Sequence, residues 1–183
     1  MRLTGLVLTI RNALEFAVIF ALWWAVGKAI DDRALSPLAL AALIVAVAWI
    51  KTAFFGIENI RQLWRASAEN MAYYKFLLLM LVNMWQIVVA FALDFHLLHC
   101  LNDKSFAVVD ATLTGDPLLF EFFYYSALNF MFFGYGDITP QTIPAKLLTL
   151  TEISLAFVTV IFLLSDFISL KESIGVRKVE RDR

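Results

Sequence analysis

The 183-residue chain contains one cysteine, four prolines and seven glycines. Cys100 cannot form a disulfide within the chain, so no covalent framework is available. The low glycine and proline content excludes collagen-like and low-complexity chains. Charged residues are also scarce: they make up 17% of the chain, against about 25% in a typical soluble protein. The 15 basic and 16 acidic residues nearly balance, which gives no reason to expect a nucleic acid partner.

Hydrophobic residues, in contrast, make up 61% of the chain, and the mean hydropathy is +0.77. A soluble fold of this length has too little interior to bury so much apolar surface, so lipid must cover part of it. The chain has no nucleophile–base pairing, phosphate-binding glycine loop or cofactor fingerprint. We therefore expect an integral membrane protein that is not an enzyme and has no cofactor.

Four apolar runs are long enough to cross the hydrocarbon core, which takes about 20 helical residues. We expect these spans at Leu14–Ile30, Ser36–Ile57, Tyr74–Leu98 and Pro144–Leu170. A shorter apolar run, Pro117–Phe133, cannot cross and return, and it is followed by glycines. This shape is typical of a re-entrant helix, which needs protein or a water-filled cavity around it. The sequence therefore predicts an all-α membrane protein with four transmembrane helices and a re-entrant segment between the third and fourth.

The basic residues predict the orientation. With both termini cytoplasmic, only Lys28, Arg33, Lys104 and Lys146 of the 15 basic residues fall outside, as the positive-inside rule requires. The external segment 102–137 then carries five acidic residues and one lysine. It is either a vestibule that concentrates cations or simply a solvated acidic loop. A compact chain without long loops fits a prokaryotic inner membrane.

Charged residues near the second span predict the rest of the N-terminal half. Lys51 is expected near an interface, where its ammonium group can reach water, and Arg11 is expected to pair with Glu15. The helically spaced set Glu58, Gln62, Arg65 and Glu69 indicates the wet face of a cytoplasmic linker helix. The predicted domains are residues 1–70, with two peripheral spans and this linker, a pore domain at 71–172, and a short charged cytoplasmic tail at 173–183.

The most distinctive motif follows the re-entrant run: Phe132, Phe133, Gly134, Tyr135, Gly136 and Asp137. Two glycines around one aromatic residue allow successive carbonyls to turn the same way, because glycine adopts positive φ without a Cβ clash. Carbonyls arranged around an axis can replace the hydration shell of a monovalent cation. The C-terminal end of the preceding short helix also favours a cation.

With these residues, the stretch FGYGDITP resembles the T-V-G-Y-G-D-x-x-P filter of the potassium channel superfamily. The resemblance covers about residues 124–170, and the third span supplies the outer helix. It implies that Gly134, Tyr135 and Gly136 form the selectivity filter and that Asp137 lies just outside it. It also implies that Tyr124 and Tyr125 brace the filter from behind. Because such pores surround their axis with four filter segments and this chain has one, we expect a four-fold homotetramer in lipid.

The filter departs from the family at two positions, where Phe132 replaces threonine and Phe133 replaces valine. Four Phe132 rings would either constrict the pore or rotate away on a different backbone. The resemblance implies a tetrameric cation channel selective for potassium, with K⁺ or alternatively Na⁺ as the permeant ion. The alternative is a channel-like scaffold or sensor that conducts poorly, without selectivity or not at all because Phe132 obstructs the pore.

Two patterns compete for the pore-facing side of the fourth span. Glu152, Thr159 and Asp166 form a polar stripe at seven-residue spacing, which usually faces water or protein. Positional matching to the family instead predicts that four apolar residues face the pore axis: Phe157, Val160, Leu164 and Ile168. The matching makes the cavity apolar and places Glu152 behind the filter. Asp166 is then either an ion ligand at the inner mouth or a partner for a basic group.

His96, His99 and Cys100 share one helical face near the outer end of the third span, close to Asp94. These residue types can hold zinc or copper. A small metal-dependent enzyme or transporter using these three residues is therefore a third reading. The competing interpretation is that titratable residues simply gather where a span leaves the bilayer, and we favour it because no other ligand cluster matches.

Overall fold

The computed structural model describes residues 2–68, 73–108, 112–134 and 136–181, with side chains described for 11–64, 74–108, 112–134 and 136–164. The helices in this part of the chain are α1 (Arg2–Asp31), α2 (Pro37–Ala68), α3 (Tyr73–Leu101), α4 (Gly115–Phe130) and α5 (Ile143–Arg181). Between α3 and α5 lie a short 3-10 turn, η1 (Asp103–Ser105), and the strands β1 (Phe106–Val108) and β2 (Ile138–Pro140).

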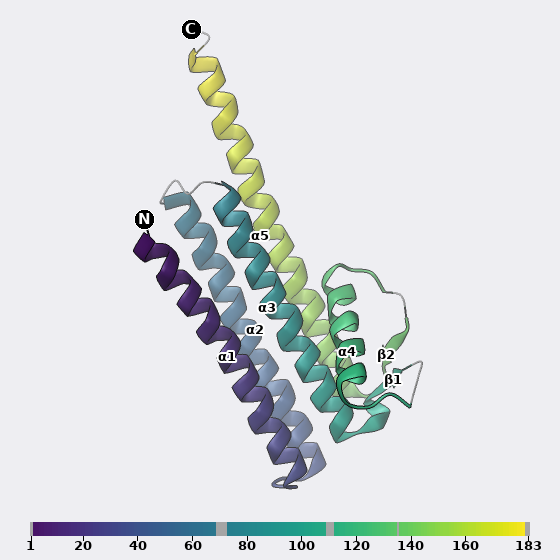
Figure 1. The fold of residues 1–183 in the computed structure, drawn as a ribbon. Helices are drawn as coiled ribbons and strands as arrows, with labels where there is room; N and C mark the ends of the chain where they lie inside the picture. Colours follow the sequence, from purple (N-terminus) through teal and green to yellow (C-terminus); the bar gives the residue numbers. More distant parts are fainter. Residues whose placement is uncertain (1, 69–72, 109–111, 135, 182–183) are drawn as a thin grey trace.

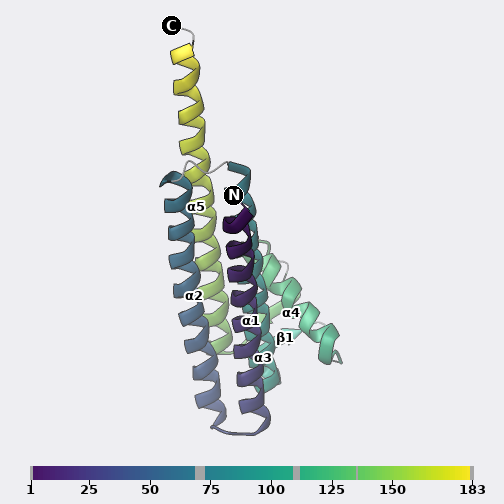
Figure 2. The ribbon, with the colours of Figure 1, turned by 60° about the vertical axis from the view of Figure 1, so that its left-hand side comes forward.

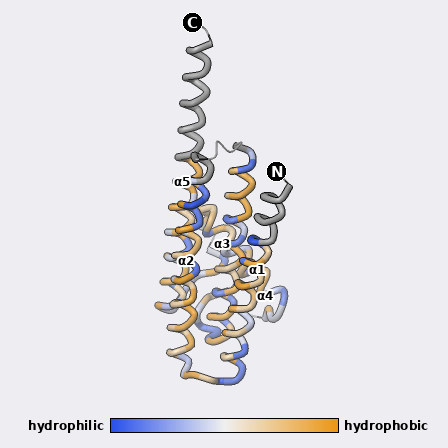
Figure 3. The backbone as a smooth tube through the Cα atoms, turned by 90° about the vertical axis from the view of Figure 1, so that its left-hand side faces the viewer, coloured by the Kyte–Doolittle hydropathy of each residue, from blue (hydrophilic) through white to orange (hydrophobic). Residues whose placement is uncertain are grey.

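The helices α1, α2, α3 and α5 are long and apolar enough to span a membrane. They lie alongside one another, and α5 extends beyond the others at its C-terminal end (Figures 1 and 2). Both chain ends lie at the same end of the bundle (Figure 1). Hydrophobic residues predominate along the described helices, and the end of α1 at the turn to α2 is hydrophilic (Figure 3). The predicted four-span, all-α class is confirmed.

Three helices run well beyond their predicted spans, and α1 does so at its start, at Arg2 instead of Leu14. The linker expected after Ile57 is the continuation of α2 to Ala68, and α5 continues to Arg181 through most of the charged tail. The sequence contains no proline from Thr52 to Ala68 or from Ala145 to Arg181, so nothing in these stretches breaks a helix. At the start of α2, the Ser36 hydroxyl accepts a hydrogen bond from the Ala39 amide at 3.3 Å, which caps the helix ahead of Pro37.

The segment between α3 and α5 enters and leaves at the same end of the bundle. Strands β1 and β2 pair antiparallel, with Phe106 opposite Pro140 and Val108 opposite Ile138. The 16 residues of α4 extend about 24 Å, which is less than the hydrocarbon thickness of about 30 Å. Figure 1 shows α4 beside α3, with the chain returning from its end to β2. The segment is therefore re-entrant, as its length predicted.

A cluster of aromatic rings holds this segment against α3. The Phe95 ring of α3 lies 5.1 Å from the Tyr125 ring of α4 and 5.5 Å from the Phe106 ring of β1, measured between centroids. The Phe106 ring in turn lies 5.3 Å from Phe122. Edge-to-face contacts of this kind add to the burial energy of the rings. The aromatic cluster therefore fixes the positions of α4 and β1 against α3.

Candidate functional site

The chain segment that follows α4 begins with a Schellman motif. The amide of Phe133 donates to the carbonyl of Leu128 at 2.8 Å, and the amide of Phe132 donates to the carbonyl of Asn129 at 3.1 Å. This motif requires a left-handed residue at the position of Phe132, where glycine is usual. Phe132 has φ +60°, which costs a residue with a Cβ about 1–2 kcal/mol. The helix end is thus closed at Phe132 at the expense of backbone strain.

The glycines of the motif differ in conformation. Gly136 has φ +81°, as the predicted turning of carbonyls requires, whereas Gly134 does not lie in the positive-φ region. The freedom to adopt positive φ, which the sequence offers at both glycines, is therefore used at Gly136 and not at Gly134. Tyr135 lies outside the described residues, so its predicted filter role stays a prediction.

The side chains around the motif leave a cleft between α4 and the returning chain. Tyr124 and Tyr125 of α4 and Phe133, Gly134, Gly136 and Asp137 of the returning segment all contribute to its lining. Phe132 is 49% exposed and Phe133 is 56% exposed in the single chain. The Phe132 ring lies 6.5 Å from the Phe157 ring of α5. The Phe132 side chain therefore points toward the same side of the molecule as the predicted pore-facing residue Phe157.

Behind the motif, α5 presents a buried carboxyl group to α4. Glu152 is fully buried; its Oε2 accepts a hydrogen bond from Asn129 Nδ2 at 3.1 Å, and its Oε1 bonds to the Ser126 hydroxyl. The Ser126 hydroxyl is also 2.9 Å from the carbonyl of Val88 on α3. One turn away, the Tyr125 and Thr149 hydroxyls are 3.1 Å apart. Glu152 therefore lies against α4, where positional matching predicted it, and joins the re-entrant helix to α3 and α5.

The two faces of α5 are clearly different in the described part. Glu152 and Thr159, which belong to the polar stripe, are both fully buried against other helices. Phe157 and Leu164 are 58% and 54% exposed, and Val160 is half-buried. The polar stripe faces protein, so the apolar face is the one left free to meet an axis. Lining of a pore by that face stays a prediction, and the side chains of Asp166 and Ile168 lie outside the described residues.

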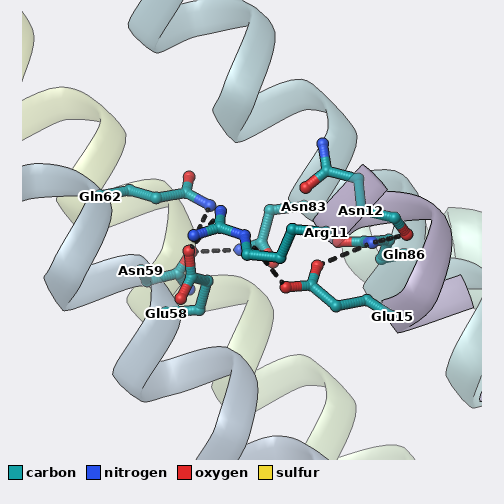
Figure 4. Close-up of polar contacts among 8 residues, drawn as sticks. All are labelled: Arg11, Asn12, Glu15, Glu58, Asn59, Gln62, Asn83 and Gln86. Atoms are coloured by element: carbon teal, nitrogen blue, oxygen red, sulfur yellow. Dashed lines mark hydrogen bonds and ion pairs between the residues drawn. The ribbon is translucent and has the colours of Figure 1, made fainter. Parts of the chain in front are cut away.

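Further inside the bundle, polar side chains of α1, α2 and α3 form a network (Figure 4). Arg11 of α1 forms the predicted pair with Glu15 at 3.4 Å and a shorter one, 2.8 Å, with Glu58 of α2. Gln86 of α3 donates to Glu15 at 3.1 Å, and Gln62 donates to Glu58 at 3.4 Å. Glu58 and Gln62 are buried, so the predicted wet face is wrong at these positions, because Glu58 pairs with Arg11 of α1 and accepts a hydrogen bond from Gln62.

A second set of buried hydrogen bonds reaches α5. Asn83 of α3 donates to the side-chain carbonyl of Asn59 on α2, and Asn59 Nδ2 donates to Thr159 Oγ1 on α5 at 2.8 Å. All three side chains are buried. Hydrogen bonds between helices hold membrane bundles together where apolar contacts can be exchanged for lipid. The peripheral helix α2 is thereby connected, together with α3, to the helix that carries Phe157.

A second buried ion pair joins α2 and α3. Lys51 Nζ lies 2.6 Å from Asp94 Oδ1 and 3.3 Å from the carbonyl of Ala90. Both side chains are at most 10% exposed. The prediction that Lys51 reaches an interface is wrong, because α3 supplies a carboxylate at the same depth. An ion pair inside a membrane bundle is costly to form and is a strong constraint on how the helices align.

The predicted metal ligands do not converge on one point. Cys100 Sγ lies 3.6 Å from His96 Nε2, whereas the His99 ring packs against Phe122 at 5.3 Å and Asp94 is paired with Lys51. Among the described residues, no group of three or more histidine, cysteine or acidic residues could hold a metal ion. The exposed position of Cys100 and the half-buried histidines agree with the interpretation that titratable residues gather at the end of a span.

Sequence reasoning missed the partners of the buried charges. The charges themselves were visible, since Arg11, Lys51 and Glu58 interrupt or adjoin apolar runs. A charge inside a span implies a partner at the same depth on another helix, and this signal makes Asp94 a candidate partner for Lys51. The choice of Glu58 for Arg11 depends on how α1 packs on α2, which a hydropathy pattern does not specify.

Comparison with known families bears on the part of the chain that carries this geometry. A family model described as an ion channel matches residues 78–172, which is just over half of the chain. The chain belongs to this ion channel family. The match begins in α3, contains α4 and the glycine motif, and ends in α5, so this channel carries its pore module in the C-terminal half. Neither the curated proteins nor the solved structures contain a match to the chain. With an ion channel domain and four apolar helices, the protein is a membrane protein, and the family match points to a channel rather than an enzyme.

Proposed function

We propose that the chain is one subunit of a homotetrameric potassium-selective channel. The observation that carries this proposal is the re-entrant α4 followed by Gly134–Asp137, on the side where Phe132, Phe157 and Leu164 are exposed. Each chain has one such segment, so several copies are needed to surround an ion with carbonyl oxygens. The exposed apolar face of α5 is the surface that a neighbouring copy would cover. K⁺ is the proposed ion, with Na⁺ as the alternative.

The proposed setting is a prokaryotic inner membrane with both termini in the cytoplasm. The two chain ends lie at the same end of the bundle (Figure 1), which is compatible with a shared side. Asp103, Asp116 and Asp137 are exposed, and they would lie outside in this orientation. Exposed carboxylates at a pore mouth raise the local cation concentration.

The direct test is ion flux through the purified full chain in liposomes, combined with the symmetry of the particle. We expect potassium uptake that exceeds sodium uptake, from a particle with four-fold symmetry. A four-fold particle without cation flux would contradict conduction, and a particle without four-fold symmetry would contradict the assembly.

Gly136→Ala is expected to reduce potassium flux by at least about tenfold. No atom lies within 4 Å of the added Cβ, so the substitution acts only through the φ of +81°, which costs an alanine about 1–2 kcal/mol in each subunit. Gly56→Ala is the matched control, because Gly56 lies within α2 and has equally open space. Flux unchanged in Gly136→Ala would show that this backbone position does not contact the permeant ion.

A second candidate function, a channel-like protein closed by its own side chains, is favoured by the exposed Phe132 ring beside Phe157. Phe132→Gly distinguishes a conducting channel from one that is closed by its own side chains, because glycine suits φ +60° and removes the ring. Phe132→Thr is a poorer choice, since a β-branched residue resists this conformation. We expect liposome flux to increase several-fold in Phe132→Gly if the ring obstructs the pore.

The matched control for Phe132→Gly is Arg33→Gly. Arg33 occupies the same position in a Schellman motif at the end of α1. Its φ is +48°, and its amide donates a hydrogen bond to the carbonyl of Ile30 at 3.1 Å. It should gain about 0.5–1 kcal/mol of stability without a change in flux. A loss of flux in Phe132→Gly alone would show that the ring supports the filter and does not block it.

A further inference from the structure

Among the described side chains, α5 forms polar contacts with other helices at two heights. Three residues within one turn near its start bond to α2 or α4: Thr149, Thr151 and Glu152. The next such contact is at Thr159, whose Oγ1 accepts a hydrogen bond from Asn59 Nδ2 of α2 at 2.8 Å. Thr159 lies about 10 Å further along the helix axis than Glu152. In the described part of α5 beyond Glu152, this single bond is therefore the directional attachment to another helix.

The packing of α5 beyond this bond is apolar. Phe162 and Leu163 pack against a buried cluster on α3, formed by Phe76 and Met80. Apolar contacts are not directional, and inside a membrane they can be exchanged for contacts with lipid. A small displacement of this part of α5 could therefore keep its apolar contacts, whereas it would break the hydrogen bond to α2.

The donors and acceptors of this bond are fixed in their roles. The hydroxyl hydrogen of Thr159 is donated to the carbonyl of Leu155 at 2.8 Å, so Oγ1 is left to accept. Asn59 must then direct its Nδ2 to Thr159 and its Oδ1 to Asn83 of α3, as the structure shows. Asn59 and Thr159 are both fully buried. Displacement of α5 would leave a buried amide hydrogen without an acceptor, which favours the position that the structure shows.

The bond to α2 and the predicted pore-facing residues lie on different sides of α5. Thr159 is buried against α2, whereas Phe157 and Leu164 are exposed. We propose that Asn59 is a positioning residue for conduction. Through Thr159 it holds this part of α5 in one of two positions, and it thereby sets the equilibrium between the closed and the open pore. This inference rests on conduction, as proposed above, and does not depend on selectivity for potassium.

Single-channel recording from the purified full chain in planar bilayers tests the role of the bond. Thr159→Val removes the acceptor at similar volume, and Thr159→Ser keeps it. We expect the open probability to change by about two- to tenfold in Thr159→Val, as for one lost hydrogen bond, and to stay unchanged in Thr159→Ser. The current through one open channel should be the same in both, because Thr159 does not lie on the exposed face. A purely structural role would lower the number of channels without changing the open probability of those that remain.

The matched control is Thr52→Val on α2. The Thr52 hydroxyl also donates to a carbonyl four residues earlier, that of Ala48 at 2.8 Å, but it bonds to no other helix among the described residues. This variant should leave the open probability unchanged. Asn59→Leu and Thr159→Val remove the same bond, so their double variant should change the open probability by less than the product of the two single changes.

Three results would overturn the inference while the unaltered chain conducts. They are an unchanged open probability in Thr159→Val, an equal change in Thr159→Ser or Thr52→Val, and independent effects of Asn59→Leu and Thr159→Val in the double variant. Absence of current from the unaltered chain would instead overturn conduction itself, and this inference with it.

Discussion

Asp94→Ala is expected to destabilise the protein by about 3–5 kcal/mol, because it leaves the Lys51 ammonium buried without its carboxylate. Lys51→Met should cause a loss of similar size by stranding Asp94. The double variant Lys51→Met/Asp94→Leu should recover most of the stability, since a buried ion pair can be replaced by apolar side chains of similar volume. Thermal unfolding in detergent, followed by size-exclusion chromatography, measures all three variants.

The control for these variants is Lys28→Met. Lys28 is exposed and lies over the Trp24 ring, with Nζ 5.4 Å from the ring centroid. Removing its charge should change stability by no more than about 0.5 kcal/mol. If the double variant loses as much stability as the two single variants added together, Lys51 and Asp94 act independently and the ion pair is not what aligns α2 with α3.

Glu152→Ala is expected to abolish ion flux and to cost about 2–4 kcal/mol of stability. The substitution removes the acceptor of Asn129 and the partner of Ser126, and it leaves a cavity behind α4. Since α4 carries the segment that begins at Phe132, its displacement would disturb the carbonyls that follow. Liposome flux and thermal unfolding, measured on the same preparation, check the two effects.

Glu152→Gln tests whether the hydrogen bonds of Glu152 are sufficient without its negative charge. The Ser126 hydroxyl has one proton but lies near two acceptors, Val88 O and Glu152 Oε1. A glutamine can donate to Ser126, which then donates to Val88, while its carbonyl accepts from Asn129. We therefore expect Glu152→Gln to keep both stability and flux. If Glu152→Gln loses as much stability and flux as Glu152→Ala, a negative charge is required at this position.

Much of the fold could be predicted because the bilayer imposes a simple rule on the sequence. Apolar runs of sufficient length indicated four spans, and the shorter run ending in glycines indicated a re-entrant helix. The positions of charges were less predictable. Lys51 was expected at an interface because it interrupts an apolar run and its ammonium could reach water there, but its partner Asp94 lies 43 residues away on α3. Hydropathy describes each helix separately and contains no information on which depths coincide.

The conformation of the candidate site was predictable only in part. The glycine motif and the contact of Glu152 with α4 followed from sequence position, whereas the left-handed Phe132 did not. Glycine adopts positive φ more readily than other residues, so the sequence indicated Gly134 and Gly136 as the positions that allow it. The left-handed residue is instead Phe132, because the amides of Phe132 and Phe133 donate to the last free carbonyls of α4. The conformation at a helix end depends on these hydrogen bonds as well as on the type of residue that follows.

The uninterrupted course of α2 has a mechanical consequence. Lys51 and Asn59 are eight residues apart on one helix, about 12 Å along its axis, and each contacts α3, at Asp94 and at Asn83. Two attachment points at different heights on a rigid rod prevent α3 from sliding or swivelling relative to α2. A slip of one residue would separate both contacts at once. The pair α2 and α3 should therefore move as a single block, whatever displacement occurs elsewhere in the subunit.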